Sequence, residues 1–214
     1  MTDFSDLRRI MVERHIAGRD IDSPALLDAF RTVPREEFVS PALVGEAYAD
    51  RPLPLGFGQT ISQPYIVALT IHAAGIGRED KVLEIGAGSG YAAAIISRIA
   101  ARVIAIERLP ALAGPCRDRL HRLGYDNVTI VEGDGTCGCA DEAPFDAIVA
   151  AASGSHIPQI LIDQLKPGGR IVMPIGDPGS IQVLVKGTKR EDGALQLEDL
   201  GGVRFVPLIG ENGF

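Results

Sequence analysis

The sequence has few cysteines and little basic charge. Only three of its 214 residues are cysteines, an odd number without a disulfide framework, which suits a reducing cytoplasm. Lysine and arginine number 21 against 28 aspartate and glutamate residues, so the net charge is −7. Because phosphate backbones attract basic surfaces, this charge balance disfavours a nucleic-acid partner.

The sequence also has no segment with the pattern of a signal peptide or a membrane span. Charged residues interrupt every apolar run in residues 1–16, unlike the core of a signal peptide. The apolar stretch 63–77 contains a proline and a histidine and is shorter than the roughly 20 residues that a spanning helix needs. We therefore expect a cytoplasmic protein with no membrane partner.

Two parts of the chain differ in pattern, and we expect them to pack as one structural domain. Residues 1–75 form a helical and loop-rich part, in which helical spacing and stop signals predict helices over 3–17 and 23–33. Residues 34–63 contain prolines and glycines too closely spaced for long elements. A long irregular segment of this kind is often functional, so it is a candidate substrate-facing loop.

Residues 76–214 predict an α/β fold with a Rossmann-like sheet. Strands are expected at 81–85, 103–106, 128–131 and 145–150, with helices at 91–100, 111–123 and 156–165. These strands are uniformly apolar, which is typical of a parallel sheet covered on both faces. Further strands at 170–174, 181–186 and 203–208 leave no room for crossover helices, so the sheet should end in antiparallel strands.

A glycine-rich turn at 86–90 joins the first of these strands to a helix. Glycines let a backbone approach a ligand closely, and the free N–H groups of a helix start attract anionic groups. A dinucleotide fingerprint needs a third glycine at position 91, where this chain has Tyr91, and no P-loop is present. The turn therefore favours a ligand other than NAD or ATP, the alternative being a turn without a ligand.

Two more polar loops follow strands at the same edge of the predicted sheet. Glu107 ends its strand about 20 residues after the glycines, where a carboxylate can accept hydrogen bonds from both ribose hydroxyls. Its alternative role is a solvated charge at a strand end. Asp134 lies between two glycines and is either a ligand or a turn residue. By contrast, Cys137 and Cys139 lack a second pair at ligand spacing and indicate a surface loop, not a metal site.

These motifs together resemble those of a known enzyme class. Residues 84–91, Glu107, 133–135, 145–148 and 165–169 look like the motif series of S-adenosylmethionine-dependent methyltransferases. Residues 33–35, 58–64 and 203–208 resemble the protein-L-isoaspartate O-methyltransferase family more narrowly. The resemblance spans nearly the whole chain, and the sequence Gly-Gln-Thr-Ile-Ser-Gln-Pro at 58–64 is its most specific part.

The resemblance implies methyl transfer from S-adenosylmethionine to the free α-carboxylate of L-isoaspartyl residues in damaged proteins and peptides, with repair through a succinimide. It places Ser62 in the active site. The sequence leaves the oligomeric state open, and a monomer is favoured. The resemblance also implies a set of residues that contact the cofactor or line its cleft. These are Gln59, Thr60, Ile61, Glu84, Gly86, Ala87, Gly88, Ser89, Gly90, Glu107, Asp134, Gly135 and Thr136.

The chemistry of such a transfer agrees with the side chains present. A carboxylate with a reference pKa of about 3.5 to 4 is ionised at neutral pH and needs no general base. The site must position it and remove its water without neutralising it. A hydroxyl such as that of Ser62 meets this need, whereas lysine or arginine would make the carboxylate a poorer nucleophile.

Three alternatives remain at this point. Ser62 could merely cap the helix expected from Pro64. The chain could be a related methyltransferase acting on a small-molecule carboxylate or hydroxyl. It could also be a protein that binds S-adenosylmethionine without catalysis.

Overall fold

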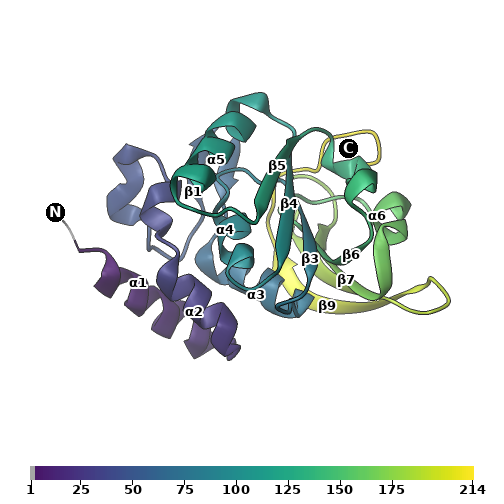
Figure 1. The fold of residues 1–214 in the computed structure, drawn as a ribbon, viewed down its shortest axis with the longest axis horizontal. Helices are drawn as coiled ribbons and strands as arrows, with labels where there is room; N and C mark the ends of the chain where they lie inside the picture. Colours follow the sequence, from purple (N-terminus) through teal and green to yellow (C-terminus); the bar gives the residue numbers. More distant parts are fainter. Residues whose placement is uncertain (1–2) are drawn as a thin grey trace.

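A seven-stranded sheet forms the centre of the computed structural model, which describes residues 3–214. Its order is β5-β4-β3-β6-β7-β8-β9 (Figure 1). The strands are β3 (Lys81–Ile85), β4 (Arg102–Glu107), β5 (Val128–Glu132), β6 (Phe145–Ala150), β7 (Leu165–Ile175), β8 (Gln182–Lys189) and β9 (Leu195–Val203). Strands β3 to β7 pair in parallel, and β8 and β9 are antiparallel. This confirms the predicted α/β class and its antiparallel end.

Helices cover both faces of this sheet. Helices α3 (Pro64–Ala74), α4 (Tyr91–Ser97) and α5 (Pro110–Arg122) lie on one side, and α6 (Gln159–Asp163) lies on the other (Figure 1). Successive residues of a strand point to opposite faces, so Val82 belongs to the hydrophobic cluster under α3 to α5 and Leu83 to the cluster on the α6 side. The central strands β3, β4 and β6 are therefore buried on both faces.

Two sequence predictions in the second half of the chain are wrong. The strand expected at 203–208 is largely an irregular segment, because β9 ends at Val203 after pairing with β8. The apolar residues at its two ends are nevertheless buried, since Val203 is 7% and Leu208 is 6% exposed. The helix expected at 156–165 is limited to the five residues of α6 (Gln159–Asp163). Pro158, with a ψ angle of 132°, is not helical, and β7 already begins at Leu165.

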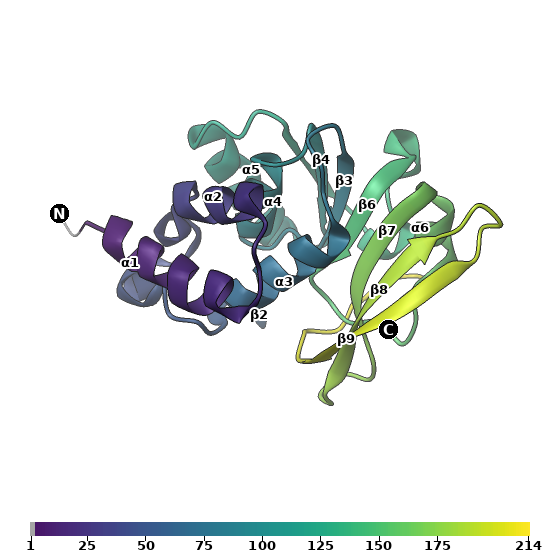
Figure 2. The ribbon, with the colours of Figure 1, turned by 90° about the horizontal axis from the view of Figure 1, so that it is seen from below.

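The N-terminal part adds a further helical layer. Helix α1 (Ser5–Met11) continues as a π-helical turn (Val12–Ile16) and a 3-10 turn (Ala17–Arg19), followed by α2 (Pro24–Thr32). Figure 2 shows α1 and α2 on the side of α3 and α4 that faces away from the sheet. Both helices predicted there are present, with shorter α-helical bounds.

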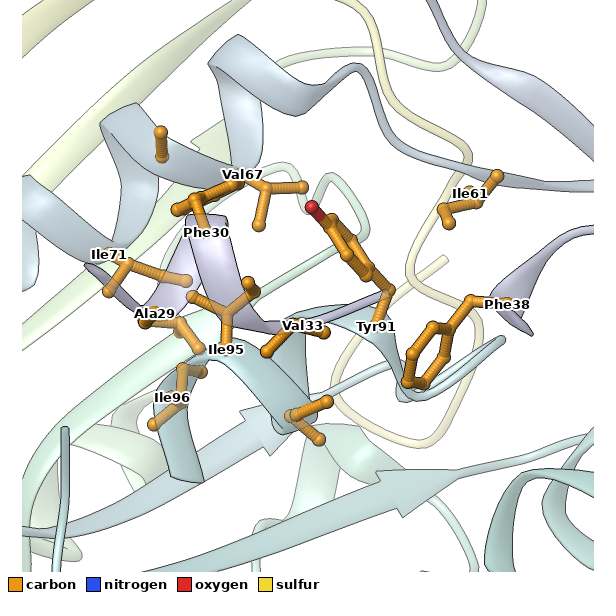
Figure 3. Close-up of a cluster of buried hydrophobic side chains, with 14 of the residues drawn as sticks. Ala29, Phe30, Val33, Phe38, Ile61, Val67, Ile71, Tyr91, Ile95 and Ile96 are labelled. Atoms are coloured by element: carbon orange, nitrogen blue, oxygen red, sulfur yellow. The ribbon is translucent and has the colours of Figure 1, made fainter. Parts of the chain in front are cut away.

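One hydrophobic cluster joins this layer to the sheet domain. Phe30 of α2, Val67 of α3 and Ile95 of α4 point toward one another, with Tyr91 beside them (Figure 3). Tyr91 is 1% exposed and packs its ring edge-on against Phe30 and Phe38. The residue that replaces a third glycine is thus a core residue, and its large aromatic ring fills the space between Phe30 and Phe38.

The irregular segment 34–63 crosses from the helical layer to the cleft described below. It contains two 3-10 segments (Arg35–Phe38 and Pro41–Glu46) and a two-stranded hairpin of β1 (Leu53–Gly56) and β2 (Gln59–Ile61). The expectation of no long element there is confirmed. Across residues 3–214, no helix is long and apolar enough to cross a membrane.

Candidate active site

A cleft of about 680 Å³ opens at the carboxyl ends of the parallel strands. It lies where the strand order reverses between β3 and β6, the position at which open α/β sheets bind ligands. Its walls come from the ends of β3, β4 and β6, the segment 59–63 and the segment 202–209. The volume falls in the range of ordinary small-molecule sites.

The glycine-rich turn forms the floor of the cleft. Gly86 and Gly88 line it with φ angles of 86° and 53°, values that only glycine adopts without strain. Gly90 has a different role, because a Cβ there would lie 2.8 Å from Cys116 Sγ on α5. That glycine allows the start of α4 to pack against α5.

Glu107 connects this turn to the end of β4. Its Oε2 accepts a hydrogen bond from Gly88 N at 2.8 Å, and its Oε1 accepts one from Leu109 N at 2.9 Å. The residue lines the cleft and is 6% exposed, so it is not a solvated strand-end charge. Each carboxylate oxygen can accept a second hydrogen bond, which leaves capacity for a pair of ligand hydroxyls.

Glu84 lies in a smaller cavity of about 40 Å³ beside the cleft. It is 1% exposed, and its Oε2 has no hydrogen-bond partner. Burial raises the pKa of Glu84 to about 8, and repulsion from Glu107 is the smaller second cause. A buried carboxylate oxygen that accepts no hydrogen bond is complementary to a cationic group.

Ser62 lines both cavities. Its carbonyl oxygen accepts a hydrogen bond from Arg35 Nη2 at 2.8 Å. The N-cap of α3 is Gln63, and no side chain caps that helix. The helix-cap role considered for Ser62 is therefore wrong, and its hydroxyl is available to a ligand in the cleft.

The other predicted residues fall into two groups. Gln59, Thr60 and Gly135 line the cleft with the residues above, whereas Ala87, Ser89 and Thr136 do not. Ile61 is 3% exposed and packs in the hydrophobic cluster (Figure 3). The direct cofactor contacts predicted for these residues outside the cleft wall remain predictions.

Asp134 also lies outside the cleft wall, because its oxygens hold the chain's last residues. Oδ1 accepts hydrogen bonds from Thr136 N and Oγ1 at 2.8 and 2.7 Å, and Oδ2 accepts one from Glu211 N at 2.7 Å. Asn212 N donates to Thr136 Oγ1 at 3.0 Å. The loop after β5 thereby anchors the segment that supplies Leu208 and Ile209 to the cleft.

Sequence reasoning missed several residues of the site. Gln63, Arg108 and Arg204 line the cleft, and Arg35 supports Ser62 from behind. The only sequence signal for Arg35 and Arg204 was their place in the motifs at 33–35 and 203–208. Among the described residues, no group of three or more His, Cys, Asp or Glu side chains could hold a metal ion.

Comparison with known proteins identifies the family. The family model described as protein-L-isoaspartate(D-aspartate) O-methyltransferase matches residues 7–213. The chain belongs to this family. Curated relatives include a protein-L-isoaspartate O-methyltransferase 2 from Pelobacter propionicus, 49% identical over 97% of this chain and 92% of the relative. A protein-L-isoaspartate O-methyltransferase from Methylorubrum extorquens is 52% identical over 97% of this chain and 90% of its own length.

Solved structures of the family share the fold. A protein-L-isoaspartate O-methyltransferase superposes with a TM-score of 0.84 at 29% identity, covering 98% of this chain and 67% of the other. A putative member from Plasmodium falciparum, in complex with S-adenosyl-L-homocysteine, gives a TM-score of 0.81 at 25% identity over 98% and 99% of the two chains. The Rossmann-like methyltransferase fold is confirmed, and the family is dependent on S-adenosylmethionine.

Proposed function

We propose that this chain transfers the methyl group of S-adenosylmethionine to the free α-carboxylate of L-isoaspartyl residues in damaged proteins and peptides. The observation that carries the proposal is the position of Ser62, which does not cap α3 and lines a cleft together with the glycine turn and Glu107. The resulting ester would allow repair through a succinimide. Family membership supports the same reaction.

The residues of the cleft fit the cofactor. Gly86 and Gly88 bring bare backbone to its floor, and Glu107 retains acceptor capacity for the two ribose hydroxyls. Glu84, buried without a donor on Oε2, would hold the cofactor's ammonium group. When bound, the cofactor supplies an electrophilic methyl group on a positively charged sulfur.

The protein's own contribution to the reaction is placement. A carboxylate needs no base at neutral pH, so Ser62 has to donate a hydrogen bond to one oxygen while the other attacks in line. The cofactor would supply the methyl group and its sulfur would keep the bonding electrons, so no side chain of the protein would have to move a proton. The walls at 59–63 and 202–209 enclose the reacting groups and reduce competition from water,.

The test is transfer of a labelled methyl group from S-adenosylmethionine to an isoaspartyl peptide. The wild type should form a base-labile methyl ester, and Ser62→Ala should lower kcat/KM by roughly 10- to 100-fold because placement is lost. The dissociation constant for S-adenosylhomocysteine should stay within about twofold, since the hydroxyl is assigned to the substrate.

Other outcomes would point to the alternatives. Cofactor binding without transfer to any peptide would indicate a non-catalytic binding protein. Transfer to small carboxylates or hydroxyls but not to the isoaspartyl peptide would indicate a related methyltransferase. A Ser62→Ala variant with unchanged turnover would show that Ser62 has no role in the reaction.

A cytoplasmic location is also part of the proposal. All three cysteines are free, and Cys116 is buried while Cys137 and Cys139 are partly exposed. Unpaired thiols of this kind suit a reducing compartment. Cell fractionation followed by immunoblotting tests the location, and enrichment in an oxidising compartment would contradict it. The expected monomeric state remains a prediction.

A further inference from the structure

Arg35 is a fully buried cation that forms no ion pair with a carboxylate of the described residues. Its exposure is 0%. Nε donates to Ala47 O and Nη2 donates to Ser62 O, both at 2.8 Å, and the guanidinium lies 4.6 Å from the ring centroid of Tyr91. Nη1 has no hydrogen-bond partner. Burial lowers the pKa of Arg35, yet a guanidinium remains charged at neutral pH.

Two other arginines with little exposure have a carboxylate partner, whereas Arg119, which is half-buried, donates to the Ser89 carbonyl without one. Arg8, in the same helical layer, pairs with Glu36 at 2.9 Å and donates to Tyr48 Oη at 2.7 Å. Arg170 pairs with Asp80 at 2.8 Å. Because a buried charge without a counterion is costly, holding two carbonyl groups does not by itself explain an arginine at position 35.

Asp50 favours the charge of Arg35 without forming an ion pair with it, and the position of Arg35 brings a second anion site within reach. Nη2 contacts the carbonyl of Ser62 from behind, and Ser62 lines the cleft on its other side. The neighbouring Gln63 is fixed separately, because its Nε2 donates to Asp50 Oδ2 at 2.8 Å. The part of the cleft lined by Ser62 is therefore separated from a buried positive charge by a single residue.

We propose that Arg35 is a positioning residue that attracts the substrate carboxylate to Ser62 through the protein interior without touching it. The inference rests on the proposed function. A direct arginine contact would hold the carboxylate firmly but withdraw charge from the attacking oxygen. A charge placed behind Ser62 favours binding of the anion and leaves its lone pairs free for the methyl transfer.

The test compares charged and neutral ligands. An isoaspartyl peptide and its twin with a carboxamide in place of the α-carboxylate are titrated by calorimetry at pH 6.5 in the presence of S-adenosylhomocysteine. Arg35→Gln and Arg35→Met remove the charge and should lower the preference for the carboxylate by about 10-fold, the effect of one charge at an effective dielectric constant near 20. Arg35→Lys keeps the charge and should retain the preference within about threefold.

Arg8→Gln is the matched control, because it breaks a partly buried pair in the same layer, and Arg8 has no hydrogen bond to the segment 59–63. It should lower the melting temperature and leave the preference unchanged. If the neutral and charged variants at position 35 shift the preference equally, or weaken both ligands in parallel, Arg35 is only structural. If the wild-type protein neither binds nor methylates the isoaspartyl peptide, the proposed function itself is wrong.

Discussion

At the scale of single residues, the site is built from ionisable groups that are buried with few partners. Glu84 and Glu107 are 1% and 6% exposed on the cofactor side, and Arg35 is 0% exposed behind Ser62. Buried charges that lack partners destabilise a fold unless a ligand compensates them. We infer that the free protein is less stable than it would be with apolar residues at these positions, because the groups are arranged to bind ligands.

Glu84→Gln should therefore stabilise the free protein at alkaline pH. The pKa of Glu84 is about 8 against an ordinary value of 4.5, so between these values the folded state keeps a proton that the unfolded chain has lost. The contribution of Glu84 to the free energy of unfolding is therefore largest below about pH 4.5 and declines as the pH rises to about 8. Since one pKa unit is worth about 1.4 kcal/mol, the variant should gain a few kcal/mol at pH 8.

Urea unfolding at pH 5 and pH 8 measures this gain, which should be small at pH 5. The same variant should bind S-adenosylhomocysteine at least about 10-fold more weakly, because it loses a charge-assisted bond to the ammonium group. A variant that is less stable than the wild type at both pH values would show that Glu84 stabilises the fold and is not held in reserve for a ligand.

At the scale of elements, apolar pattern alone identified the parallel strands and misidentified the segment 203–208. Strands β3 and β6 are buried on both faces, so their composition determines their structure. Val203 ends β9 and pairs with Gln182, whereas Leu208 is buried equally well outside any ladder, against the cleft. An apolar sequence pattern indicates that a segment is buried, but it does not indicate whether the segment is buried within a sheet or against another part of the protein.

The anchoring of this segment gives a prediction for Asp134. Asp134→Ala removes the acceptor of Thr136 N and Glu211 N and should lower the free energy of unfolding by about 1 to 3 kcal/mol. Because Leu208 and Ile209 wall the cleft, cofactor affinity should fall as well. Hydrogen exchange at residues 208–214, with calorimetry, measures both effects.

Asp192→Ala is the matched control, since Asp192 Oδ1 accepts from Ala194 N at 3.1 Å in an exposed turn outside the cleft wall. It should leave exchange at 208–214 and cofactor affinity unchanged. Equal effects of the two substitutions would mean that the segment is held by its apolar contacts and not by Asp134.

At the scale of the whole molecule, the helical layer and the sheet meet around the segment 59–63. The glycine turn and Glu107 could be predicted from physical rules, because parallel strands deliver their loops to one edge. Ser62 could be located only through resemblance, since its role depends on a hairpin and a helix start folded against the cleft. Arg35 was missed as a site residue because a charged residue after a proline resembles a surface turn until tertiary packing buries it.

The central claim is that this cleft places an α-carboxylate at Ser62, and one comparison tests it most directly. An isoaspartyl peptide and its normal aspartyl twin differ only in the branch that carries the free carboxylate, which lies one methylene farther from the main chain in the aspartyl form. Since a displacement of about 1 Å can cost on the order of 100-fold in rate, kcat/KM should favour the isoaspartyl peptide by at least about 100-fold. Methylation of both peptides at similar rates would contradict the claim.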